Sequence, residues 1–70
     1  MNIKQIKNYL LSKINSPVII IYNGSRNRKE KYKGRIYKIY NNVFTIKLDN
    51  NEVKSFSYID ILIKTIQIYI

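Results

Sequence analysis

The first part of the chain carries apolar residues at helical spacing. Asn2 precedes this segment and is a residue type that caps a first helical turn. Pro17 disfavours helical backbone at Ser16, so the helix is expected to end before the proline. The pattern therefore predicts a helix over about residues 2–14, packed on the domain through one stripe. Four residues form that stripe: Ile3, Ile6, Leu10 and Ile14.

After Pro17 the apolar period shortens to that of β-strands. Residues 18–22 are apolar on both faces, so we expect a sheet interior to cover one face and the N-terminal helix the other. Gly34, inside the second strand, predicts a bulge or a sharp bend. Residues 57–62 are expected to form a single helical turn. Five segments are predicted as strands: 18–22, 30–40, 43–48 (with Phe44, Ile46 and Leu48 facing inward), 53–58 and 64–70.

This order of elements predicts one mainly β domain over residues 1–70. We expect a small five-stranded SH3-like or Sm-like barrel over about residues 17–70, with the N-terminal α-helix packed on it. Closure would hide strand edges that otherwise invite aggregation. A domain of 70 residues lies near the lower limit for folding alone, so a homodimer is one way to bury more surface.

The residue types needed for most catalytic sites are missing. The chain has no histidine and no cysteine, which excludes the usual zinc sites, and it has no glycine-rich phosphate loop. Its four acids are Glu30, Asp49, Glu52 and Asp60. Glu30 is expected to pair with the basic residues around it, Asp49 and Glu52 to flank a hairpin turn, and Asp60 to cap a short turn. We therefore expect no enzyme activity, no metal and no cofactor.

The chain is strongly basic, with 13 Lys and Arg against 4 Asp and Glu and a formal charge of +9. Such an excess attracts polyanions by Coulomb forces and counterion release. A solvated basic surface is the alternative, because Ile, Lys, Asn and Tyr all have A/T-rich codons and a skewed genome would supply lysines that bind nothing. The longest apolar run, residues 18–22, is too short to span a bilayer, and the N-terminus lacks the features of a secretory signal. We expect a soluble cytoplasmic protein without membrane insertion.

Lysine and arginine concentrate in residues 23–35. A β-hairpin arm carrying this run is a candidate clamp for nucleic acid, because arginine forks suit phosphate oxygens and a tyrosine can stack on unpaired bases. The candidate binding residues are Arg26, Arg28, Lys29, Lys31, Lys33, Arg35 and Tyr32.

Four motifs along the chain match a known family. They are Ile-Lys-x-x-Leu at 6–10, Asn-Gly-x-Arg at 23–26, Tyr-x-x-Val-Phe-x-Ile-x-Leu-Asp at 40–49, and Ser-x-Ser-Tyr-x-Asp-Ile-Leu-x-x-Thr at 55–65. With them the chain resembles the Veg family of Gram-positive bacteria over essentially its whole length, although it is more basic. The resemblance implies a regulatory role in gene-expression control that promotes biofilm formation.

Three mechanisms are consistent with that role. The first is a regulator that binds nucleic acid through the basic hairpin; the strand pattern is also similar to Sm-like RNA-binding barrels. The alternative is a protein-interaction module that binds an acidic partner, such as a transcriptional regulator, without contacting nucleic acid. The third is self-association through outward Tyr37, Val43 and Tyr69. Whether the ligand is DNA, RNA or protein stays open at this point.

Overall fold

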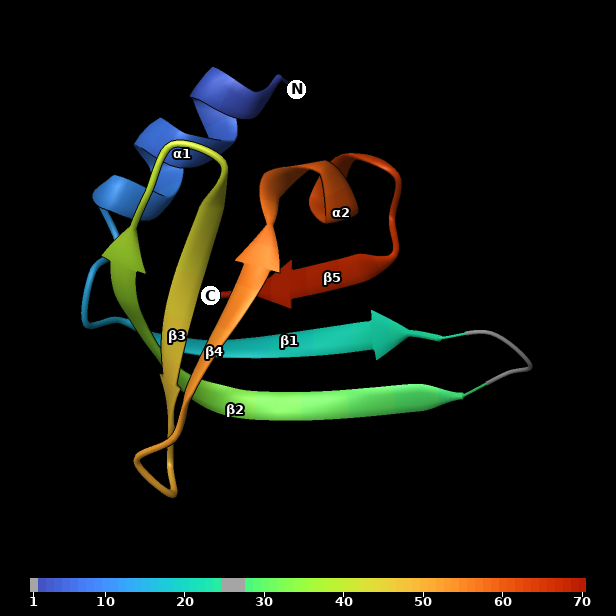
Figure 1. Ribbon diagram of the computed structural model, residues 1–70. Helices are drawn as coiled ribbons and strands as arrows, with labels where there is room; N and C mark the ends of the chain where they lie inside the picture. The colour runs from blue at the N-terminus through green and yellow to red at the C-terminus, as the bar shows by residue number, and fades with distance from the viewer. Residues whose placement is uncertain (1, 25–27) are drawn as a thin grey trace.

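The computed structural model describes residues 2–24 and 28–70 (Figure 1). All five strands belong to one antiparallel sheet, in the order β4-β3-β2-β1-β5. This confirms the predicted mainly β fold with an N-terminal helix and a short second helix. Along the chain the elements are α1 (Ile3–Leu11), β1 (Pro17–Asn23), β2 (Lys29–Ile39), β3 (Val43–Leu48), β4 (Val53–Ser57), α2 (Tyr58–Leu62) and β5 (Ile66–Tyr69).

The helix α1 begins where the sequence predicts. The side chain of Asn2 accepts a hydrogen bond from the Gln5 N–H at 2.8 Å, and the Gln5 side chain accepts one from the Asn2 N–H at 3.0 Å. This reciprocal pair satisfies two N–H groups that would otherwise lack partners. Ile6 and Leu10 are buried in the core, which confirms the central part of the apolar stripe.

The helix ends earlier than predicted, at Leu11 instead of about residue 14. The reason is tertiary: the Asn15 N–H donates to the Ile36 carbonyl at 2.8 Å, which draws the chain toward β2. Asn15 adopts a φ of 70°, a left-handed conformation that ends the helical path. Ile14, the last residue of the predicted stripe, is consequently exposed.

The long strand β2 is shared between two ladders that overlap only at Gly34 and Arg35. Its first part pairs with β1, from Asn23↔Lys29 to Pro17↔Arg35, and its last part pairs with β3. The sheet bends at the overlap, so that β3 and β4 cross β1, β5 and the first part of β2 at a steep angle (Figure 1). A Cβ on Gly34 would lie 2.2 Å from the Lys47 carbonyl oxygen, so the bend requires a glycine there.

A β-bulge is present too, but further along β2 than Gly34. The register between β2 and β3 shifts between Ile36 and Ile39. The buried hydroxyl of Thr45 fills this irregularity, because it accepts from the Lys38 N–H at 2.9 Å and donates to the Lys38 carbonyl at 3.1 Å. The prediction of a bulge or bend at Gly34 is therefore met by the bend, with the bulge displaced toward Lys38.

The sheet is not closed into a barrel, so the predicted SH3-like or Sm-like barrel is not confirmed. Among the described residues, β4 pairs only with β3, and β5 only with β1. The short helix α2 follows β4 directly and packs against both β4 and β5 (Figure 1). Part of the interior surface is therefore covered by a helix where a closed barrel would have a strand pair.

The core lies on the concave side of the bent sheet, beneath α1 and α2. In β1, Val18 and Ile20 are fully buried, whereas Ile19 and Ile21 on the other face are half-buried. The expectation that the N-terminal helix covers this second face is wrong, because α1 packs on β2 and α2. The buried apolar residues are Ile6, Leu10, Val18, Ile20, Ile36, Phe44, Ile46, Tyr58 and Ile66.

Candidate polyanion-binding face

Four basic residues alternate along β2 and point away from the core. They are separated by Glu30, Tyr32 and Gly34, which point to the opposite side. Successive side chains of a strand alternate between faces, so residues two apart repeat roughly every 6.6–6.8 Å along one face. We call these four exposed residues the basic row: Lys29, Lys31, Lys33 and Arg35.

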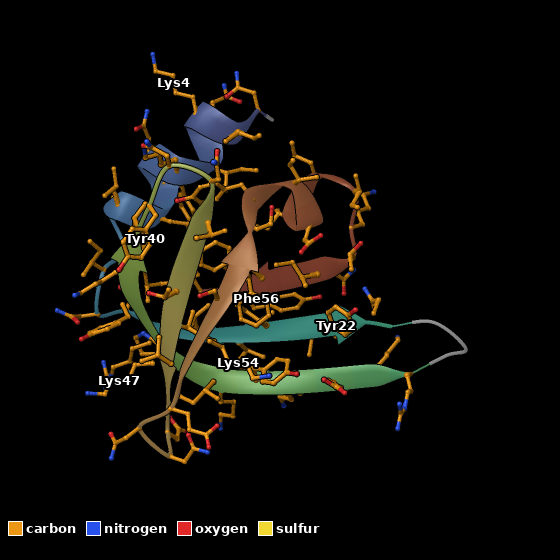
Figure 2. All side chains as sticks on the ribbon, viewed as in Figure 1. Lys4, Tyr22, Tyr40, Lys47, Lys54 and Phe56 are labelled. Carbon is orange, nitrogen blue, oxygen red and sulfur yellow. The ribbon has the colours of Figure 1, made fainter. Side chains whose placement is uncertain are left out.

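Lys47 of β3 extends the basic row onto the neighbouring strand. It lies directly opposite Arg35 in the β2–β3 ladder and is exposed. Figure 2 shows its side chain pointing away from the sheet. Arg35, Tyr37 and Lys47 together line a shallow groove of about 380 Å³. The Lys47 Nζ lies 5.8 Å from the centre of the Tyr37 ring, and the Lys38 Nζ lies 5.4 Å from it.

We call the basic row with Lys47 and Tyr37 the basic face. Like charges directly opposite each other in a ladder destabilise a sheet, as for Arg35 and Lys47. Arg35 is held in place by its guanidinium, which donates to the Asn15 carbonyl at 2.8 Å. Its remaining N–H groups are available to a ligand, since a guanidinium carries five donors. The arrangement brings five positively charged side chains, Lys29, Lys31, Lys33, Arg35 and Lys47, to one face of the sheet.

Tyr32 is the predicted site residue that the structure separates from the basic row. Its ring lies on the concave side, 5.7 Å from that of Phe56, and the Lys54 Nζ lies 4.6 Å from its centre. Its hydroxyl donates to the Glu30 carboxylate. This hydrogen bond, followed by burial, raises the pKa of Tyr32, and Lys54 acts in the opposite direction.

Two predicted site residues remain, Arg26 and Arg28. Arg26 is outside the described residues. Arg28 is exposed, and its carbonyl accepts a hydrogen bond from the Gly24 N–H at 2.7 Å. The paired β1 and β2 extend beyond β3 and β4, with β5 beside β1 as far as Tyr22 (Figure 1), which confirms the predicted hairpin.

The sequence analysis did not select Lys47 as a candidate binding residue. A signal for Lys47 was present, because Phe44, Ile46 and Leu48 were predicted to face inward and Lys47 therefore outward. Its position opposite Arg35 depends on the β2–β3 register, which the sequence does not show.

Two of the four acids, Glu30 and Asp60, have surroundings that differ from the expected ones. Glu30 accepts from Tyr32, where pairing with the neighbouring basic residues was expected. Asp60 lies in the first turn of α2, but the cap is Ser57, whose side chain accepts from the Ile59 N–H at 3.2 Å.

Within residues 2–24 and 28–70 no three metal-ligating side chains gather in one place. In that same part, no helix is both long enough and apolar enough to cross a membrane.

Comparison with known protein families shows which family the chain belongs to. The family model described as "Biofilm formation stimulator VEG" matches residues 1–69. The chain belongs to the VEG family. Comparison with curated proteins finds no match. VEG membership confirms the resemblance drawn from the four motifs and associates the chain with the stimulation of biofilm formation.

Proposed function

We propose that this VEG-family chain is a non-enzymatic cytoplasmic regulator that binds nucleic acid through its basic face. Through this binding it acts in gene-expression control that promotes biofilm formation. The observation that carries the proposal is the alignment of Lys29, Lys31, Lys33 and Arg35 on one exposed face, continued by Lys47. A scattered distribution of the same charges would not favour one binding surface.

The chemistry of the basic face suits a phosphate backbone. Lysine supplies compact charges and arginine supplies a planar fork that fits phosphate oxygens. Neutralised phosphates release counterions, so affinity is expected to fall linearly with salt concentration on logarithmic axes. Tyr37 adds an exposed aromatic ring beside the cations, on which an unpaired base can stack. The face is therefore suited to backbone contact with little discrimination among sequences.

A salt titration tests this proposal. Binding of a fluorescent duplex DNA and of a single-stranded RNA is measured by anisotropy over a series of salt concentrations, with polyglutamate as an acidic control polymer. We expect tight binding of a nucleic acid at low salt and a steep negative salt slope. If polyglutamate binds as tightly as either nucleic acid, with the same slope, the proposal fails in favour of an acidic protein partner.

Two single-charge variants locate the interface. Lys47→Gln removes a charge from the basic face, and Lys4→Gln removes the same charge from an exposed position on α1 (Figure 2). Removal of one phosphate contact lowers the magnitude of the salt slope by about 1, whereas loss of a remote charge barely changes it. We expect weaker binding and a shallower slope for Lys47→Gln alone. Equal effects of both variants would mean that total charge, and not this face, determines binding.

A further inference from the structure

The first part of β2 has an open edge. The Gly24 N–H donates to the Arg28 carbonyl and the Ile36 N–H to the Ser16 carbonyl, so the even-numbered residues of β2 direct their backbone groups toward β1. The odd-numbered residues direct theirs to the other side, as shown by the Asp49 N–H, which donates to the Lys33 carbonyl.

The open edge is defined by Lys29 and Lys31. β3 pairs with β2 only from Gly34 onward, and no other strand of the described chain lies beside residues 29–32 on that side. The N–H and C=O groups of Lys29 and Lys31 therefore face outward from the sheet. Such a row of backbone donors and acceptors is a template for one more strand.

A hollow is present at this edge. It measures about 230 Å³ and lies where the β3–β4 turn leaves the side of β2. The two flanks of the edge differ in chemistry. On the outer face are the ammonium groups of Lys29, Lys31 and Lys33. On the concave face are the half-buried rings of Tyr32 and Phe56 with Lys54. Figure 2 labels Phe56 and Lys54. The residues lining the hollow are Lys31, Tyr32, Lys33, Leu48, Asp49 and Asn50.

We propose that an acidic, extended segment of a partner protein adds as a strand to the open edge of β2. In an added strand, alternate side chains fall on the two faces of the sheet. Acidic residues would face Lys29, Lys31 and Lys33, and apolar residues would face the rings of Tyr32 and Phe56. The charges disfavour a second copy of this chain, because pairing two such edges would bring lysine against lysine. This inference does not rest on the proposed nucleic-acid function.

Amide hydrogen exchange tests the proposal directly. The probe is a peptide of alternating glutamate and valine, long enough to cover residues 29–33, and a lysine–valine peptide of the same pattern is the control. The Lys29 and Lys31 amides should exchange rapidly in the free protein. With saturating glutamate–valine peptide we expect their exchange to slow by at least about tenfold. Unchanged exchange at both amides would overturn the proposal.

Two further outcomes would also overturn it. Protection by the lysine–valine peptide would mean that the edge does not select acidic strands. Protection that appears on raising the protein concentration without peptide would mean that a second copy occupies the edge.

A pair of variants at one position separates backbone pairing from charge. Lys31→Pro and Lys31→Ala both remove the ammonium group, but only proline removes the N–H, which points away from β1. We expect the proline variant to bind the glutamate–valine peptide about five- to tenfold more weakly than the alanine variant. Equal peptide affinity of the two would contradict strand addition.

The same pair distinguishes this proposal from nucleic-acid binding. Both variants carry the same charge, so they should bind an oligonucleotide equally whether or not the strand-addition proposal holds. Slow exchange of the Glu30 and Tyr32 amides, which face β1, checks that the proline variant keeps the hairpin.

Discussion

The two faces of β2 differ in almost every physical respect although they belong to the same strand. On the concave side Ile36 is completely buried, and Gly34 lies against the backbone of β3. On the outer side Lys31 and Lys33 are exposed. Because side chains alternate between the two faces before the bulge of β2, one strand supplies both the core and the candidate binding surface. Substitutions of neighbouring residues should therefore affect either stability or binding, but seldom both.

The concave side is held together by a row of aromatic rings. Tyr32, Phe56, Phe44 and Tyr58 follow one another with centroid separations of 5.7, 5.9 and 5.7 Å. The row runs from the hairpin arm to α2 and so joins the two parts of the bent sheet. On the outer side, in contrast, the opposed Arg35 and Lys47 repel each other. A local feature that reduces stability is typical of a surface kept for binding.

The largest expected effect is on the aromatic row. Phe44 is fully buried between Phe56 and Tyr58, so Phe44→Ala should lower the free energy of unfolding by about 3–5 kcal/mol. This loss is a large share of the free energy of unfolding of a typical domain, which is roughly 5–15 kcal/mol. Urea denaturation followed by circular dichroism measures it. Phe44→Leu retains most of the buried volume and should cost much less, and equal losses for both would contradict a packing explanation.

The second-largest loss of stability is expected at the bend of β2. Gly34→Ala places a Cβ 2.2 Å from the Lys47 carbonyl, inside van der Waals contact, and should destabilise the fold by about 1–3 kcal/mol or more. Gly24→Ala is the matched control, because its Cβ would meet Tyr22 and Arg28 at 3.2 and 3.3 Å. We expect it to cost less than about 1 kcal/mol. A larger loss in the Gly24 variant would mean that the bend does not limit stability.

Much of the fold could be predicted because its signals are local. The alternation of Phe44, Ile46 and Leu48 specified the buried face of β3, and Asn2 specified the start of α1. The end of α1 was missed because a hydrogen bond from Asn15 to β2 overrides the continuing apolar period. Barrel closure was predicted but is not confirmed, because it depends on whether β4 and β5 meet, a contact between distant segments that no local pattern reports.

The candidate site was predictable as a run of charge and, within β2, as one face of a strand, but not in its extension onto β3. The run contains both the basic row and the interleaved Tyr32, and strand alternation sends Tyr32 to the other face. Lys47 joins the row from another strand through the register of β3. The sequence thus indicated the charge and the face of β2 that carries it, and only tertiary structure showed that Lys47 shares that face.

An intermediate effect is expected at the far end of the aromatic row. The Tyr58 hydroxyl donates to the Tyr40 carbonyl at 2.6 Å, so Tyr58→Phe should cost about 1 kcal/mol at neutral pH. Burial raises the pKa of Tyr58 above its ordinary value of 10.0, which favours the neutral phenol in the folded state. The stability that this shift contributes is complete below pH 10 and is lost as the pH rises through the folded pKa.

Urea titrations at increasing alkaline pH measure this contribution. The gap in unfolding free energy between the unmodified chain and Tyr58→Phe should narrow as the pH rises above about 10. Tyr32, whose pKa is also raised, is present in both proteins and cancels from the comparison. A gap that stays constant across this range would show that Tyr58 does not titrate differently in the folded state.

The smallest effect on stability is expected at Lys47, on the outer face. Lys47→Gln removes the repulsion with Arg35, which stabilises the sheet by roughly 0.2–1 kcal/mol, and it also removes a cation–π contact with Tyr37 of about 0.5–1 kcal/mol. The two nearly cancel, so the unfolding free energy should change by less than about 0.5 kcal/mol. Urea titrations at low and high salt measure it, since salt screens the repulsion more than the packing. A decrease in unfolding free energy of more than about 1 kcal/mol would mean that the basic face contributes to folding. The separation of stability and binding between the two faces of β2 would then not hold.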